Sequence, residues 1–477
     1  MITVSLVSLG CAKNQVDSEV MLGFLRRRGF EVTSSPARAE VIVVNTCGFL
    51  EVAREEGYAT IREMAALKRT GRCRKLVVAG CLVQHRAEKM RADLPEVDQF
   101  LALNDVERIA EACDPESAAF DPDRSEATYL PDERAPRLLT SPGPSAYLKI
   151  SEGCDNPCAF CVIPRIRGRF RSRSAASLVA EARMLSEAGV KEINIIAQDS
   201  TSYGSDTGYD QGLPGLLRAL GQVGGARWIR ILYAYPNKVT RALIDAIAQT
   251  PNVLPYLDVP LQHASRELLS RMRRGGSRES FARMIDELRV RLNGLSLRST
   301  FMVGFPGETE QEFEELRSFV EEIEFDHIGV FTYSHEPGAP SFETADDVPA
   351  PLKDERRQIL LDIQESISTR KYRERIGSVL NVLVEGRGVE PRTFMGRAAF
   401  QAPEVDGAVV FRGCSRAGEF NDVLVEDAVA YELIGRAAGR RTSADRTRTL
   451  RPRPGEDASV PAPIRSASGR RTLPVVP

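Results

Sequence analysis

Residues 147–161 read Tyr-Leu-Lys-Ile-Ser-Glu-Gly-Cys-Asp-Asn-Pro-Cys-Ala-Phe-Cys, a short apolar strand that runs into three closely spaced cysteines, Cys154, Cys158 and Cys161. A loop at the C-terminal end of a parallel strand is where α/β folds place their chemistry. Three thiolates on such a loop suit three irons of a cubane cluster and leave the fourth iron open. The alternative is structural zinc, which normally takes four ligands. No fourth Cys or His lies nearby, so the spacing favours iron–sulfur.

Strand and helix patterns continue to alternate after this loop, which predicts a parallel sheet. Six strand–helix units favour a partial (βα)6 barrel over a closed eightfold one. The expected strands are 147–151, 192–198, 228–235, 254–260, 296–303 and 327–333. Helices are expected at 175–188, 241–249, 267–273 and 280–292, and a charged helix at 353–375 leads away from the sheet.

The first part of the chain predicts a second parallel sheet. Apolar, β-branched runs at 3–8, 40–45 and 75–79 are each followed by a helical pattern, at 14–28, 52–68 and 84–92. Nearly continuous apolar strands fit a sheet that helices cover on both faces. We therefore expect a flavodoxin-like α/β domain here.

A cysteine follows each of these three N-terminal strands directly: Cys11, Cys47 and Cys81. The carboxyl ends of parallel strands gather ligands at one edge of a sheet, so the three thiols are expected to converge. Neighbouring glycines would let the backbone approach a bulky inorganic group. The alternative is three buried small hydrophobic residues, which is how free Cys usually behaves. Cys73, Cys113 and Cys414 fit that alternative.

The remaining segments complete an α/β multidomain chain. We expect an N-terminal domain at 1–113, a Pro-, Asp- and Ser-rich linker at 114–145, a core at 146–371, and a tail at 437–477. Short strands separated by Gly and Pro at 372–436 predict a small antiparallel barrel. This barrel has 8 Arg against 10 Asp and Glu, a net charge of −2. The tail has 9 Arg against 3 acidic residues and should be disordered.

Composition narrows the class of protein. A formal net charge of −2 over 477 residues gives no whole-chain reason to expect a polyanionic partner. The sequence has no apolar run that approaches the ~18–20 residues needed to cross a bilayer, and it starts without a basic secretory n-region. We therefore expect a cytoplasmic protein without membrane contact, in which nine cysteines indicate metal or redox chemistry.

With Phe160 before its last cysteine, the 154–161 loop resembles the cluster loop of the radical S-adenosylmethionine (SAM) superfamily. Together with the strand-end cysteines, the chain resembles the methylthiotransferases, which have an auxiliary cluster domain, a radical SAM core and a TRAM-type barrel. Five stretches are similar to the branch that modifies a ribosomal protein: 8–19, 149–154, 161–169, 257–264 and 303–309.

The resemblance implies two [4Fe–4S] clusters. Cys11, Cys47 and Cys81 would hold the auxiliary cluster and its sulfur, and the catalytic cysteines Cys154, Cys158 and Cys161 would hold the cluster that binds SAM. One SAM would methylate the sulfur, and a second would supply a 5′-deoxyadenosyl radical. The implied product is a methylthio group on the β-carbon of one aspartate in ribosomal protein uS12. An electron-donor protein is implied as a partner, and we expect a monomer.

Two further groups of residues each have a functional and a purely structural interpretation. Gln198 and Asp199 end one strand and Gly304 ends another, where they would meet SAM or form ordinary βα turns. The alternating run Arg165, Arg167, Arg169, Arg171 and Arg173 predicts either a solvated edge or a clamp for a carboxylate. We assign no role to His263.

Two other functions remain open at this point. The tRNA branch of the family methylthiolates an adenosine, but RNA binding favours a basic barrel, and this barrel is acidic. The basic tail adds the prospect of non-specific contact with ribosomal RNA. A different class is a non-catalytic, zinc-stabilised RNA-binding adaptor. The adaptor would be colourless and contain zinc, whereas the enzyme would be brown and contain iron.

Overall fold

The computed structural model describes residues 1–140 and 143–438. Its N-terminal unit is a five-stranded parallel sheet in the order β2-β1-β3-β4-β5. This order and the helices on both faces confirm the predicted flavodoxin-like α/β unit. The strands are β1 (Thr3–Ser8), β2 (Glu31–Val32), β3 (Val41–Thr46), β4 (Lys75–Gly80) and β5 (Gln99–Leu101). The helices are α1 (Ala12–Arg27), α2 (Glu51–Thr70), α3 (Cys81–Asp93) and α4 (Ile109–Cys113).

The central unit is a six-stranded parallel sheet in the order β13-β12-β11-β10-β9-β6, which confirms the partial barrel. Its strands are β6 (Ser145–Lys149), β9 (Glu192–Ile196), β10 (Trp228–Ile231), β11 (Val253–Asp258), β12 (Ser296–Val303) and β13 (His327–Thr332). Its helices are α5 (Ile163–Arg167), α6 (Ala175–Glu187), α7 (Gly212–Gly221), α8 (Arg241–Gln249), α9 (Arg266–Arg271), α10 (Arg278–Arg291), α11 (Glu310–Ile323) and α12 (Ala350–Arg373). The short strands β7 (Ser151–Glu152) and β8 (Arg171–Ser172) pair beside the cysteine loop.

The C-terminal unit is a closed five-stranded barrel in the order β14-β15-β16-β18-β17. Four of its strand pairs are antiparallel, as predicted, but β16 and β18 pair in parallel. The strands are β14 (Val379–Arg387), β15 (Thr393–Ala398), β16 (Ala408–Arg412), β17 (Phe420–Val429) and β18 (Glu432–Ala437). The predicted basic tail lies, from residue 439 on, outside the described residues, and the domain boundaries drawn from the sequence stay a prediction.

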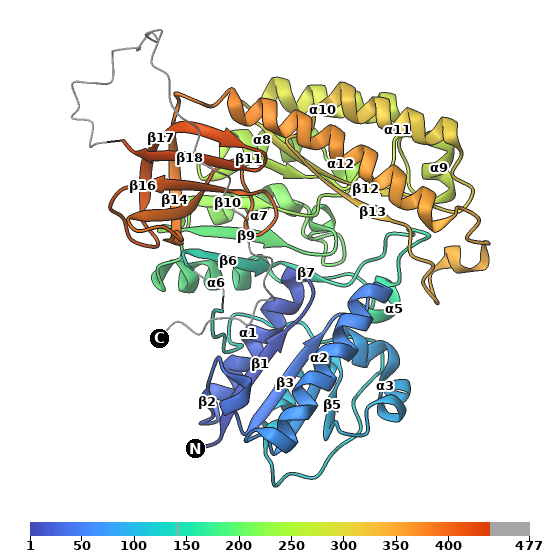
Figure 1. The fold of residues 1–477 in the computed structure, drawn as a ribbon, viewed down its shortest axis with the longest axis vertical. Coiled ribbons are helices and arrows are strands. Elements are labelled where there is room, and N and C mark those ends of the chain that lie inside the picture. The colour runs from blue at the N-terminus through green and yellow to red at the C-terminus, as the bar shows by residue number, and fades with distance from the viewer. Residues whose placement is uncertain (141–142, 439–477) are drawn as a thin grey trace.

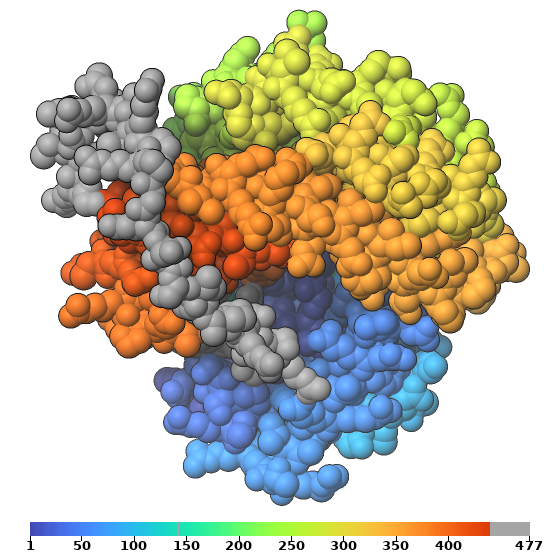
Figure 2. Space-filling model, turned by 45° about the horizontal axis from the view of Figure 1, so that its top comes forward, coloured from blue at the N-terminus to red at the C-terminus, as the bar shows by residue number. Residues whose placement is uncertain are grey.

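Figure 1 shows the N-terminal unit below the central sheet and the barrel at one end of that sheet. In the space-filling view the N-terminal unit forms a separate lobe against the rest of the chain (Figure 2). The segment 114–140 connects the N-terminal unit to the central unit through Arg137. This side chain pairs with Glu19 of α1 at 2.6 Å and with Glu181 of α6 at 2.6 Å. No helix in the described part of the chain is long and apolar enough to span a bilayer.

The barrel is fixed to the central sheet by buried charges. Glu192, at the start of β9, is fully buried and pairs with Arg397 of the barrel and, at 2.9 Å, with Arg230 of β10. These arginines hold the pKa of Glu192 down, to about 2, against the desolvation that would raise it. The charged carboxylate therefore stabilises the docked barrel, because it compensates the charges of two buried arginines.

Changing Glu192 to Gln is expected to destabilise the protein by about 3–5 kcal/mol at pH 7, because buried Arg230 loses the carboxylate it pairs with and buried Arg397 keeps only Glu385. Since the folded pKa of Glu192 lies below its ordinary value of 4.5, the carboxylate's contribution is complete above that value. The gap between wild type and variant should therefore shrink as the pH falls from 4.5 toward 2. Urea unfolding across this range measures it. Glu374→Gln, at a side chain that is 61% exposed, is the control; equal effects of both changes would contradict the prediction.

Candidate active site

All six cysteines that follow strand ends or form the 154–161 loop line one cavity of about 310 Å³ between the N-terminal and central units. The sequence predicted two separate sets of cysteines. The structure adds that both sets line the same cavity. The lining residues are Cys11, Lys13, Cys47, Phe49, Cys81, Cys154, Asn156, Cys158, Phe160, Cys161, Ile163, Ile166, Arg167, Gln198, Tyr233, Ala234, Tyr235, Pro260, Gln262 and Arg274.

The N-terminal set sits at the carboxyl edge of its sheet. Cys11 is the N-cap of α1, Cys81 is the first residue of α3, and Cys47 directly follows β3. The N-terminus of a long helix carries a partial positive charge that favours a thiolate. This effect applies to Cys11 on α1. It does not extend to Cys81, because α3 is kinked at Arg86, five residues after Cys81.

Glycines bring the three N-terminal cysteine loops together. Gly10 has φ +91°, and a Cβ there would lie 2.7 Å from the Cβ and 3.3 Å from the Sγ of Cys47. Gly80 has φ +99°, and a Cβ there would lie 2.2 Å from Oδ1 of Asn45. The sequence suggested that these glycines admit an inorganic group. The structure shows that they also let one loop approach the next, which no residue with a side chain would do.

The sulfurs of the 154–161 loop accept hydrogen bonds from N–H groups of the loop itself, of the residue that begins α5 and of a residue distant in sequence. Asn156 Nδ2 donates to Cys154 Sγ at 3.4 Å, Arg274 Nη1 donates to Cys158 Sγ at 3.3 Å, and the Ile163 amide donates to Cys161 Sγ at 3.5 Å. Each of the three sulfurs thus accepts at least one hydrogen bond from an N–H group. Donors of this kind stabilise sulfur ligands and set the reduction potential of iron–sulfur clusters.

The thiols fit a cationic inorganic group. Burial raises the pKa of Cys81 and Cys161 to about 12 and also raises that of Cys47 and Cys154. Buried thiols become ligands when a metal stabilises the thiolate. Within 1–140 and 143–438, no three His, Cys, Asp or Glu side chains converge as the ligands of a single ion would. In a cubane each cysteine binds a different iron, so the two triads remain suitable donors for clusters.

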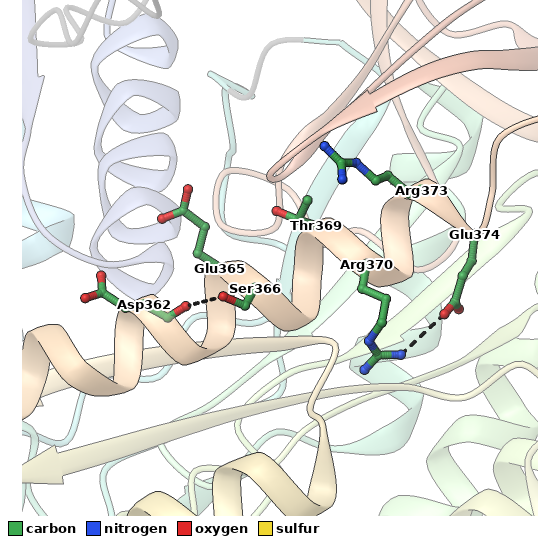
Figure 3. A pocket seen from close by; sticks show the side chains of 7 residues that line it. All are labelled: Asp362, Glu365, Ser366, Thr369, Arg370, Arg373 and Glu374. Carbon is green, nitrogen blue, oxygen red and sulfur yellow. Dashed lines mark hydrogen bonds and ion pairs between the residues drawn. The ribbon is translucent and has the colours of Figure 1, made fainter.

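A larger hollow lies away from this chemistry. It measures about 760 Å³ and runs along the exposed side of α12, where Arg370 pairs with Glu374 (Figure 3). The described residues that line it belong to α12, except Glu374, which directly follows that helix, and none is a cysteine. Volume alone would select this hollow, but the donor groups and the enclosing walls select the cysteine cavity.

Comparison with known proteins agrees with this geometry. The uncharacterized protein family UPF0004 matches residues 3–102, the radical SAM superfamily matches 148–320 and the TRAM domain matches 376–438. The ribosomal protein uS12 methylthiotransferase RimO of Anaeromyxobacter sp. (strain K) is 47% identical over 461 residues, which cover 95% of this chain and 96% of the relative. The chain belongs to the RimO family. RimO of Desulforamulus reducens is 43% identical over 449 residues, covering 92% and 100% of the two chains.

Membership of the RimO family makes the chain a radical SAM methylthiotransferase and implies SAM and iron–sulfur clusters as cofactors. Among solved structures, the radical SAM methyltransferase TsrM of Kitasatospora setae matches with a TM-score of 0.52 at 14% identity, covering 87% of this chain and 80% of that one. At that identity the similarity concerns the fold. The zinc-adaptor alternative does not fit a chain of this family.

Of the three residues expected to meet SAM, Gln198 is among the described residues that line the cavity, whereas Asp199 and Gly304 are not. Gln198 lines the cavity and donates from Nε2 to Glu152 at 2.7 Å, while its Oε1 is buried without a hydrogen-bond partner. Asp199 accepts from Asn156 Nδ2 at 2.8 Å and from Lys238 at 2.8 Å. Asp199 therefore positions Asn156, which reaches the cavity, and is not itself among the described residues that line it.

Gly304 also lies apart from the described lining of the cavity. Its φ is +74°, and a Cβ there would lie 2.2 Å from Cγ of Lys353 on α12. Its amide donates to Glu308 at 2.5 Å, and Glu308 also contacts His263 at 3.2 Å. Packing against α12 therefore explains the glycine, whereas a contact of Gly304 with SAM stays a prediction.

The arginine run from 165 to 173 is neither a solvated edge nor a five-residue clamp. Residues 163–167 form α5, so alternate residues do not share a face as they would in a strand. Arg165 and Arg169 are exposed, whereas Arg167 and Arg173 are buried. Arg167 donates to Asp17 and Glu152, each at 2.9 Å, and its Nε lies 3.2 Å from Cys81 Sγ.

Sequence reasoning missed several lining residues, chiefly Lys13, Asn156, Tyr233 and Arg274. Lys13 follows Cys11 by two positions and Asn156 stands inside the 154–161 loop, so proximity to the cysteines was an available signal. Tyr233 has φ +62°, an unusual value for a bulky residue, and no sequence pattern indicates it.

Proposed function

We propose that this member of the RimO family inserts a methylthio group at the β-carbon of an aspartate of ribosomal protein uS12, with Cys154, Cys158 and Cys161 holding one [4Fe–4S] cluster and Cys11, Cys47 and Cys81 a second. The observation that carries the proposal is the single cavity that both triads line. A reaction that joins a radical source to a sulfur source needs both beside the same substrate atom.

When bound, the two clusters would supply an electron to cleave SAM and a sulfur to be transferred. The chain's own residues would bind, orient and shield. Asn156 and Arg274 would fix the loop that carries the first triad, and the buried acceptor Oε1 of Gln198 is available to a donor group of SAM. Phe49, Phe160 and Tyr235 would exclude water, which protects reactive species from side reactions.

The charge of the barrel supports a protein substrate over tRNA. Arg397 and Asp406 are the described charged residues of the barrel that are buried, so removing both leaves 7 Arg against 9 Asp and Glu on its accessible surface. Phosphate contacts dominate RNA binding, and an acidic surface repels them. A basic ribosomal protein meets such a surface favourably, and a ribosomal substrate would place the reaction in the cytoplasm. An electron-donor protein, contact of the tail with RNA and a monomeric state stay predictions.

Anaerobic incubation of the reconstituted protein with SAM, reductant and either uS12 or tRNA tests the proposal. Mass spectrometry is expected to show a methylthio group on uS12 and none on the tRNA. A gain on the tRNA alone would overturn the substrate assignment. Iron analysis of the same preparation is expected to give about eight irons per chain if two cubanes are filled.

A further inference from the structure

Lys13 is a buried cation of the cysteine cavity that has no anionic partner among the described residues. It is 7% exposed, lines the cavity, and places its ammonium 3.2 Å from the centre of the Tyr233 ring. In the described part of the chain, no carboxylate lies within ion-pair distance of it; Asp258 acts on its charge from farther away. Asp258 instead accepts the Tyr233 amide at 3.1 Å.

The other two cations that line the cavity are already engaged. Arg167 is balanced by Asp17 and Glu152. Arg274 donates to the Pro260 carbonyl at 2.7 Å and to Cys158 Sγ at 3.3 Å, and its guanidinium lies 4.4 Å from the centre of the Tyr235 ring. Arg274 thus belongs to the side of the cavity where the 154–161 loop lies. Lys13 lies two residues from Cys11, a member of the other triad. Its charge is not paired with a carboxylate of the described residues.

The wall opposite Lys13 is held rigidly. Tyr233 adopts φ +62°, which a bulky residue keeps only where its surroundings enforce it. The Asp258 carboxylate that accepts its amide is buried and also lies 4.0 Å from Arg298. Lys13 and Tyr233 come from different units of the chain, so their contact is formed where the two units meet. The ammonium is therefore preorganised.

An anion that enters this cavity needs such a cation. Much of the lining is aromatic or aliphatic, including Phe49, Phe160, Ile163 and Ile166. A carboxylate taken from water into apolar surroundings is costly unless it is paired. We propose that Lys13 binds the side-chain carboxylate of the aspartate that is modified, and so selects aspartate over neutral residues. This inference rests on the proposed function and identifies the group that recognises its substrate.

A binding cycle tests the proposal on the reconstituted protein with SAM present. Labelled uS12 and uS12 whose target aspartate is asparagine are titrated against wild type, Lys13→Met and Lys13→Arg, and dissociation constants are read by fluorescence anisotropy. Wild type should prefer aspartate by about tenfold or more, the range of a hydrogen bond to a charged group. Lys13→Met should lose this preference, and Lys13→Arg should retain most of it. Lys89→Met, an exposed change on α3, should behave as wild type.

The affinity for SAM, measured without uS12 by equilibrium dialysis, checks folding and separates the two carboxylates involved. Unchanged SAM binding together with a lost aspartate preference supports the proposal. An aspartate preference that survives in Lys13→Met overturns it, and so does a loss of SAM affinity with the preference intact, which would assign Lys13 to the SAM carboxylate. Failure of the wild type to modify uS12 at all would instead refute the proposed function.

Discussion

Replacing Cys158 with alanine is expected to abolish formation of 5′-deoxyadenosine from SAM. The residue is the middle cysteine of the 154–161 loop, and its sulfur accepts a hydrogen bond from Arg274 at 3.3 Å. Without it, two thiols would remain where a site-differentiated cubane needs three. The loss should reach the background of the assay, because in the proposed function the reductive cleavage of SAM depends on the cluster that this loop would hold. Chromatography of anaerobic reactions with dithionite, with or without uS12, measures the nucleoside.

Cys47→Ala is the matched variant, because it removes one thiol from the other triad in the same cavity. It should leave cleavage of SAM largely intact while preventing methylthiolation of uS12. The division of labour between the triads would be refuted if both variants lost both activities equally. Cys73→Ala removes a buried thiol that does not line the cavity and should preserve both.

Changing Arg167 to Met is expected to lower the stability of the apoprotein by about 3–5 kcal/mol, the range for breaking a buried ion pair by removing one partner. Among the described residues, Asp17 and Glu152 would then pair only with Lys149, which lies 2.5 Å from Asp17 and 2.7 Å from Glu152. These residues connect α1 of the N-terminal unit to the central unit, so the loss should fall on the docking of the two. The midpoint of the first urea transition measures it.

Arg169→Met serves as the control, because that side chain is 80% exposed and should change the stability by no more than about 0.5 kcal/mol. Equal midpoints for the two variants would contradict a role for Arg167 in docking. Arg167→Lys retains the charge but not the planar fork that reaches Asp17, Glu152 and Asn14 together, so it should recover part of the loss.

Local patterns were sufficient for the long elements. The three N-terminal strands and the six central ones were predicted because near-continuous apolar runs identify buried parallel strands. Strands β2, β5, β7, β8, β15 and β18 and the short helices α4 and α5 were not predicted, and helices α7 and α11 were expected only as members of the six strand–helix units, without bounds. β2 has two residues and β5 has three, which is too short for a period to show. β15 and β18 contain glycines, Gly396 and Gly435, whose missing side chains let a neighbouring strand approach, and this weakens the strand pattern.

Of the candidate site, the sequence predicted the six cysteines, but not most of the other residues that line the cavity. Cysteines leave a signal because their spacing and their positions after strands can be counted. Lys13 stands close to Cys11 and Arg167 belongs to the arginine run, but neither pattern shows that these side chains are buried or what they contact, because burial and pairing depend on which domain packs against which. The arginine run was interpreted with a period of two, but α5 turns there, and only folding separates Arg167 from Arg165. Contacts between domains thus mark the limit of what one sequence predicts.

The position of the cavity also bears on how the target is admitted. Its walls belong to two units joined by the buried pairs of Asp17 with Arg167 and Lys149, and by Arg54 with Glu336 at 2.5 Å. Parting the units in every catalytic cycle would expose these charges and undo their pairing. We therefore expect the mouth of the cavity to stay fixed during turnover, so that access to the two triads depends on how far a residue can reach into the cavity. A residue is modified only if it projects far enough from its own protein to reach the two triads.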